Sequence, residues 1–140
     1  MAESSRQSWV PAAVLVGIGY AVVGILFAMP TTHVHAWRLA AWVVSAIGYT
    51  AHIAYELFRL KNPPGSAALH VALAVGLGAF GLAVGANIHS LSAGSTDQHR
   101  QLLLLLSLVI WPVITALPAF LVALCTNIVL TRALGNVHRR

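Results

Sequence analysis

The sequence predicts an all-α integral membrane protein, an antiparallel bundle of four transmembrane helices. Apolar residues make up 59% of the 140 residues and charged residues only 8%, whereas about 25% of residues are charged in ordinary soluble domains. Four continuous apolar runs cover residues 9–29, 36–60, 66–90 and 102–132. Each run reaches the ~20 residues that an α-helix needs to cross the hydrocarbon core of a bilayer.

The four runs form one membrane domain, residues 1–140, because the connections between them are too short to fold separately. The first run follows Arg6, as the apolar part of a secretory signal peptide would. It is longer than the about 7–15 apolar residues of a signal peptide. We therefore expect residues 9–29 to be a retained helix. Trp9 and the glycines of this run fit an interfacial anchor and a close helix contact.

The second and third runs are joined by a tight turn at residues 62–65, which contains two prolines and a glycine. Such a turn ends one helix, and Ser66 is suited to cap the next. Residues 36–60 and 66–90 are therefore expected to be antiparallel neighbours. The fourth run is longer than a bilayer requires and contains Pro112 and Pro118, which predict a bend.

The basic residues predict the orientation of the helices. One side of the four-span topology carries Arg6, Arg59, Lys61, Arg132, Arg139 and Arg140, and the other side carries Arg38 and Arg100. The positive-inside rule then places both termini in the cytoplasm, in a bacterial-type inner membrane. The formal net charge of +5 is thus a topology signal. Nucleic acid is not an expected partner, because the basic residues are few and lie at helix ends.

The second run carries a polar and aromatic stripe. Its members are alternately four and three residues apart: Arg38, Trp42, Ser45, Tyr49, His52, Glu56 and Arg59. This spacing keeps them on one face of a helix. Because ionisable side chains are costly in lipid, the stripe is expected to face the protein interior. Arg38 and Arg59, at the two ends of the stripe, are explained by the membrane interfaces near which they lie. Tyr49, His52 and Glu56, in the middle, are therefore the residues of interest.

An inner group of residues suggests a cofactor site. His52 and His70 lie at similar depths on neighbouring helices, as two axial ligands of a haem b would. Gly81 and Gly85 share a face with His70, which leaves a groove for a neighbouring helix or for a flat cofactor. Glu56 would orient an imidazole, and Tyr49 would extend the polar chain.

Three other interpretations of the inner group remain open. The polar residues can serve as hydrogen bonds between helices, with Glu56 and Arg59 as an ordinary ion pair. Tyr49, His52, Glu56 and Asn127 can line a path for protons or metal ions. A membrane enzyme with His52 and Glu56 as an acid–base pair is the third, although no motif of a known catalytic class is present.

An outer group of residues could bind a metal ion. It consists of His33, His35, His89, His99 and Asp97, in the two loops on the non-cytoplasmic side. Imidazole and carboxylate ligands suit zinc or copper. The alternative is that these histidines are simply solvated.

The leading functional prediction is an accessory or cofactor-carrying subunit of a larger membrane assembly, with His52 and His70 as haem ligands. The alternative is a proton or metal-ion transporter, which would form a homo-oligomer because four short helices enclose little space. Cys125 is the only cysteine, so an intramolecular disulfide is excluded.

Overall fold

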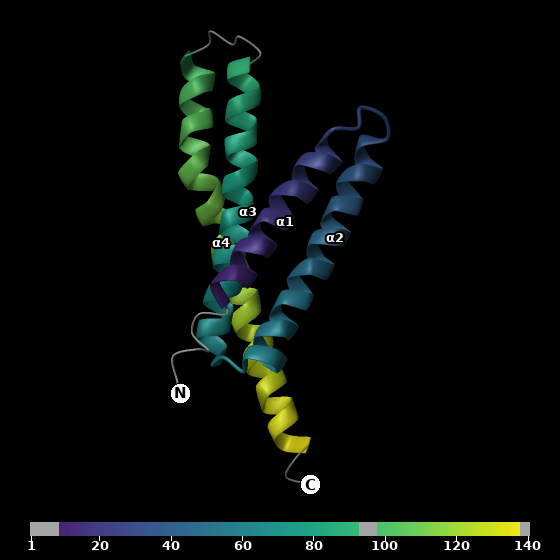
Figure 1. Ribbon diagram of the computed structural model, residues 1–140, viewed down its shortest axis with the longest axis vertical. Helices are drawn as coiled ribbons and strands as arrows, with labels where there is room; N and C mark the ends of the chain where they lie inside the picture. The colour runs from purple at the N-terminus through teal and green to yellow at the C-terminus, as the bar shows by residue number, and fades with distance from the viewer. Residues whose placement is uncertain (1–8, 93–97, 138–140) are drawn as a thin grey trace.

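The computed structural model describes residues 9–92 and 98–137, and these residues form helices without any strand. The elements are α1 (Trp9–Ala28), α2 (Val34–Ala54), the π-helix η1 (Tyr55–Leu60), α3 (Pro64–Ser92) and α4 (Gln98–Val137). Consecutive helices run in opposite directions (Figure 1). The predicted all-α class is therefore confirmed.

Within the described residues, three helices are long and apolar enough to cross a membrane: α1, α3 and α4, the last through Ala133. The exception is α2, which carries the polar stripe and passes into η1 before the run ends. Length and composition thus support three of the four predicted membrane spans.

The bounds of α1, α2 with η1, and α3 lie close to the predicted ones, whereas α4 (Gln98–Val137) is longer at both ends than the predicted 102–132. A further correction concerns the start of α3. This helix begins at Pro64, since proline has no N–H to leave unbonded and its fixed φ suits a first helical turn. The amide of Ala67 donates to the carbonyl of Pro63 at 3.0 Å. Ser66 therefore lies inside the first turn and does not cap the helix. At the other end of the chain, α4 continues through Pro112 and Pro118, and its lower part runs at an angle to its upper part (Figure 1).

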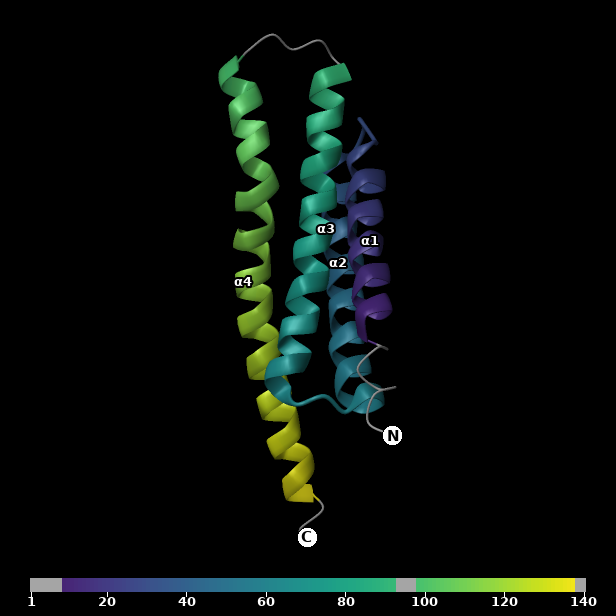
Figure 2. The same cartoon turned by 60° about the vertical axis from the view of Figure 1, so that its left-hand side comes forward.

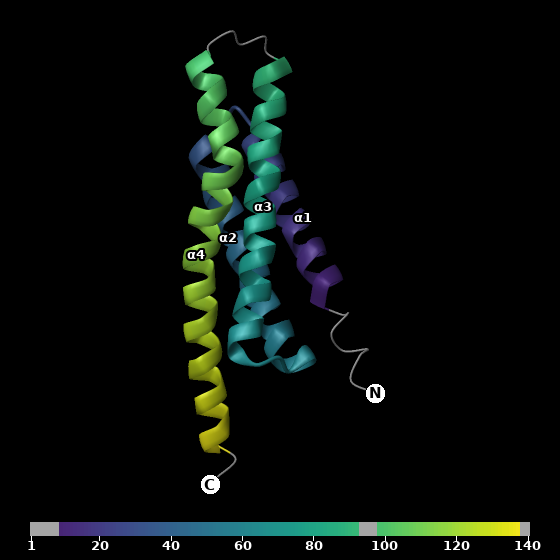
Figure 3. The same cartoon turned by 90° about the vertical axis from the view of Figure 1, so that its left-hand side faces the viewer.

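The helices form two hairpins that meet at one end and diverge at the other. Helix α3 lies between α4 and α1, whereas α2 contacts α3 only near the η1 end (Figures 1 and 3). We call the end where η1 meets the starts of α1 and α3 the closed end. The open end is where the α1–α2 hairpin points away from the α3–α4 hairpin. Figure 2 shows that α4 extends beyond the other helices at the closed end.

Glycines let α1 approach α3 very closely. A Cβ added to Gly78 would lie 2.6 Å from the Cβ of Tyr20, and one added to Gly81 would lie 2.8 Å from the Cβ of Ala21. Neither distance is possible between real side chains. The bare backbone at these two positions therefore fixes how deeply α1 sits against α3, as expected for small residues at a helix interface.

A small core lies toward the closed end, formed by Ile53, Ala68, Val71 and Ala123. It joins α2, α3 and α4. Elsewhere most large apolar side chains are exposed on the isolated chain, as Leu39 on α2 and Val129 on α4 are. Such an apolar surface is what a bilayer or a partner helix would cover.

Candidate functional site: a buried His–Glu–His cluster

The last turns of the second helix bring the chain back over Glu56. The helix widens into η1, and Lys61 then adopts a left-handed conformation with φ 52°. The backbone amides of Lys61 and Asn62 both point to the carbonyl of Glu56. Turns of π-helix are rare and occur frequently at functional sites. Here the turn places the Asn62 side chain beside the Glu56 carboxylate.

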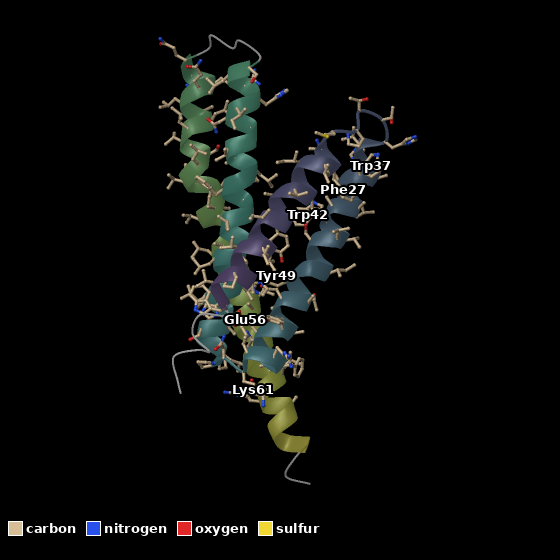
Figure 4. The ribbon with its side chains drawn as sticks, viewed as in Figure 1. Phe27, Trp37, Trp42, Tyr49, Glu56 and Lys61 are labelled. Carbon is tan, nitrogen blue, oxygen red and sulfur yellow. The ribbon has the colours of Figure 1, made fainter. Side chains whose placement is uncertain are left out.

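Glu56 is completely buried and lies between two histidines. Asn62 donates from Nδ2 to Glu56 Oε2 at 2.7 Å, and His70 Nδ1 is 3.1 Å from the same oxygen. On the other side, His52 Nε2 is 3.7 Å from Glu56 Oε1. We refer to His52, Glu56 and His70 as the His–Glu–His cluster. It joins the end of α2 to the first turns of α3, close to the place where Figure 4 labels Glu56.

Trp9 covers one face of the cluster. Its indole stacks on the imidazole of His70, with ring centroids 4.0 Å apart and ring planes 2° from parallel. Trp9 is the first residue of α1, so the close contact of α1 with α3 brings it to this position. The indole thus helps to bury His70, which is 8% exposed.

Several buried polar atoms in this region have no hydrogen-bond partner among the described residues. They include Glu56 Oε1, both ring nitrogens of His52 and both side-chain amide atoms of Asn127. Asn127 is fully buried on α4. Buried polar groups are normally bonded to protein or water. The described residues therefore leave some buried hydrogen-bonding atoms around the cluster without a partner.

The register between α2 and α4 gives the depth of Asn127. Tyr49 donates its hydroxyl to the carbonyl of Ala119 at 2.5 Å, and Ile53 shares the small core with Ala123 one turn further along. One further turn along each helix leads to the level of Glu56 on η1 and to Asn127 on α4. Asn127 therefore lies level with Glu56 along the bundle, as its place near the cytoplasmic end of the fourth run suggested.

The polar stripe of α2 is buried only in its lower part. His52 and Glu56 are 3% and 0% exposed, whereas Trp42 is 76% exposed, and Arg38 and Arg59 are also exposed. The expectation that the whole stripe faces the interior is therefore wrong for its two ends. The reason at the open end is that α2 leaves the rest of the bundle there.

An ion pair between Glu56 and Arg59 was considered for the case in which the polar residues only hold the helices together. The described residues do not form it. In the described part of the chain, the ion pairs of Glu56 are with His52 and His70, and Arg59 lies exposed. Tyr49 does not extend the cluster, because its hydroxyl is bonded to α4. Of the predicted inner residues, the structure thus brings together His52, Glu56 and His70.

The predicted haem arrangement needs open space between His52 and His70. In the structure the Glu56 carboxylate fills that space, and the indole of Trp9 covers His70. The glycine groove is filled as well, since Gly81 and Gly85 face Ala21 and Ile25 of α1. Of the two occupants considered for the groove, a neighbouring helix is the one present. The residues in this arrangement do not fit a haem, and its ligation by His52 and His70 stays a prediction.

The outer histidines do not converge. His33, His35, His89 and His99 are all exposed, and Asp97 lies outside the described residues. The end of α1 and the start of α2 lie far from the end of α3 and the start of α4, because the hairpins diverge (Figure 1). Within residues 9–92 and 98–137, no three His, Cys, Asp or Glu residues are placed to hold a metal ion. Zinc or copper binding at this end stays a prediction.

Two contributors to the site did not stand out in the sequence. Asn62 read as part of a turn, and Trp9 as an interfacial anchor. The sequence position of Asn62 contains a signal, because the side chain of an asparagine just past the end of a helix can fold back onto the last turn. Nothing in the local sequence of Trp9 indicates His70, because the contact depends on how α1 crosses α3.

Comparison with known proteins adds no relative: the chain matches no family model, no curated protein and no solved structure. Fold and site together define an all-helical protein with three helices apolar enough to cross a membrane and a buried His–Glu–His cluster at one end. Its function has to be argued from that cluster.

Proposed function

We propose that this chain is a four-span membrane protein, with both termini in the cytoplasm, that conducts protons through the His–Glu–His cluster. One observation carries the proposal: the carboxylate of Glu56 is completely buried and presents each of its two oxygens to a different imidazole. Ionisable side chains inside membrane bundles are costly, and they commonly mark proton or ion pathways.

The membrane part of the proposal is supported by three apolar helices and by the exposed apolar side chains of α2 and α4. The closed end is then the cytoplasmic end, because it holds Arg59 and Lys61 and lies on the side of both termini (Figure 1). We propose a bacterial-type inner membrane; the distribution of basic residues supports the orientation of the chain in it.

The cluster can pass a proton in two steps. Glu56 with a proton on Oε2 gives this proton to His70 Nδ1, and the carboxylate then takes a proton on Oε1 from His52 Nε2. A half-turn of the carboxyl group returns its proton to the His70 side and resets Glu56. Imidazole and carboxyl groups are the side chains best suited to such transfers near neutral pH. Protons are neither created nor consumed, so a proton gradient is a sufficient driving force.

The distances make the two steps unequal. The separation of 3.1 Å between Glu56 and His70 is a hydrogen bond, whereas the 3.7 Å between Glu56 and His52 is too long for one. The His52 ring therefore has to approach before a proton passes. Asn62 holds Oε2 on the His70 side, so His52 acts as the movable member.

The test is proton flux into liposomes that contain the purified protein and a trapped pH-sensitive dye. A potassium diffusion potential set by valinomycin drives the protons. We expect Glu56→Gln to lower the flux at least about tenfold, because the amide keeps the shape of the side chain and loses its exchangeable acid.

Thr50→Val is the matched control for this experiment. Thr50 lies on α2 and is exposed, and its hydroxyl donates to the carbonyl of Ala46 in its own helix. Its flux should equal that of the wild type. A wild-type flux no greater than that of protein-free liposomes, or an unchanged flux in Glu56→Gln, would contradict the proposal.

The accessory-subunit interpretation stays a prediction beside this one. The exposed apolar faces of α2 and α4 are surfaces that other subunits or further copies of the chain would cover. Crosslinking in native membranes measures this directly.

A further inference from the structure

The three members of the His–Glu–His cluster differ in how far they are enclosed. The side chain of His70 is 10% exposed, whereas the side chains of Glu56 and His52 are 0% and 1% exposed. His70 lies in the first two turns of α3, which begins at the closed end. His70 is therefore the member of the cluster from which a proton leaves on the cytoplasmic side of the proposed topology.

One nitrogen of the His70 ring is committed to Glu56. Its Nδ1 lies 3.1 Å from Glu56 Oε2, and it accepts the proton from the carboxyl group when Nε2 carries the hydrogen of the neutral ring. The ring then holds a hydrogen on each nitrogen. If it stayed in place and released the hydrogen of Nε2, it would be neutral again with a proton left on Nδ1. In that state it could not accept the next proton from Glu56.

The imidazole of His70 therefore has to turn about its Cβ–Cγ bond once for every proton that passes. The turn takes Nδ1 and its proton away from Glu56, the proton leaves Nδ1 for water, and the return brings a bare Nδ1 back to the carboxyl group. One N–H bond forms and one breaks for each proton, so no other reactant is needed. The turn also breaks the hydrogen bond to Glu56 Oε2.

The indole of Trp9 stands in the way of this turn. It lies parallel to the imidazole, with the ring planes 2° apart and the ring centroids 4.0 Å apart, which is already the separation of atoms in van der Waals contact. A turn about Cβ–Cγ moves the edges of the imidazole out of its plane, and one of them toward the indole. Trp9 therefore has to shift before His70 can turn.

We propose that Trp9 is a positioning residue that restrains the imidazole of His70, and that the turn of this ring sets the rate of proton conduction. The inference rests on the proton conduction proposed above. Trp9 then has two opposite effects on the path. The stack keeps Nδ1 directed at Glu56, which helps the proton transfer, and it delays the turn that makes Nδ1 available again.

The test is the liposome flux experiment with variants of Trp9. The flux of Trp9→Ala should exceed that of the wild type by about three- to tenfold, the factor in rate that corresponds to the loss of one aromatic stack. Trp9→Phe keeps a flat ring over His70 and should stay within about twofold of the wild type. Heavy water should slow Trp9→Ala more than the wild type, because proton transfer then replaces the turn of the ring as the slow step.

Two controls separate this effect from a general change in the bundle. Trp42→Ala removes an indole from a position that is 76% exposed, and its flux should equal that of the wild type. The double variant Trp9→Ala/Glu56→Gln should conduct as little as Glu56→Gln alone, which excludes a leak through a loosened closed end.

The outcomes distinguish this inference from the proposed function. A flux of Trp9→Ala at or below that of the wild type would overturn the role of Trp9. An equal effect of heavy water on both proteins, or a double variant that conducts as well as Trp9→Ala, would do the same. The proposed function would stand in these cases as long as Glu56→Gln alone loses flux, whereas a wild type without flux would overturn both.

Discussion

The two ends of α2 differ in environment although the polar stripe runs through both. At the closed end, His52 and Glu56 are sealed between α3, α1 and the turn after η1. At the open end, Trp42 is 76% exposed, because the α1–α2 hairpin leaves the α3–α4 hairpin there (Figure 3). Periodicity predicts which residues share a face of a helix. How much of that face is buried depends on where the helices cross, and the following predictions test this distinction.

The largest effect is expected from removing the central acid of the closed end. Glu56→Ala leaves His70 and Asn62 without their buried partner, and should lower the free energy of unfolding by about 3–5 kcal/mol. Trp42→Ala, at the open end of the same helix, should cost less than about 1 kcal/mol. Unfolding in mixed micelles with increasing dodecyl sulfate, followed by circular dichroism, measures both. Equal losses would show that the two ends do not differ in this way.

A methyl group placed between α1 and α3 should have the next largest effect. Gly78→Ala puts its Cβ against Tyr20 and should lower the free energy of unfolding by about 1–3 kcal/mol. Gly19→Ala is the matched control on α1, since nothing lies within 4 Å of its added Cβ. It should be neutral or stabilise the helix by up to about 1 kcal/mol. A smaller loss for Gly78→Ala than for Gly19→Ala would count against the close contact of α1 with α3.

Two asparagines allow the hydrogen bonds of the closed end to be compared with those elsewhere. Asn62→Ala removes a bond to a carboxylate and should cost about 1.5 kcal/mol or more. Asn87→Ala removes bonds to the backbone carbonyls of Ala83 and Leu104 and should cost about 1 kcal/mol. Thermal unfolding under one set of micelle conditions gives the order. The reverse order would mean that Asn62 contributes little to holding Glu56.

The smallest effects are expected at the two left-handed residues, one at each end of the second helix. Lys61 has φ 52° and His33 has φ 54°, and a side chain in this region is strained. Lys61→Gly and His33→Gly should each stabilise the fold by up to about 1 kcal/mol, partly offset by the flexibility of glycine in the unfolded chain. Similar gains at both sites would show that the ends share local geometry and differ in packing. A loss at Lys61 alone would assign its side chain a role in the cluster.

The sequence was sufficient for the helical class and the order of the helices, and its periodicity singled out His52 and Glu56, which the structure brings together with His70. Apolar runs and a helical spacing are local signals, and they do not depend on how helices pack. The position of the carboxylate between His52 and His70 depends on η1 and on Asn62, which no periodic pattern predicts. The burial of the glycine groove under α1 and the separation of the two hairpins at the open end depend on crossing angles, which local sequence signals do not give.

The stacking of Trp9 on His70 has an optical consequence. A protonated imidazole accepts an electron from an excited indole more readily than a neutral one, so the fluorescence of Trp9 depends on the charge of the ring beneath it. With Trp37, Trp42 and Trp111 replaced by phenylalanine, the emission of the remaining indole becomes a direct reading of the state of His70. The molecule thus contains its own indicator, placed in van der Waals contact with the group whose charge it reports.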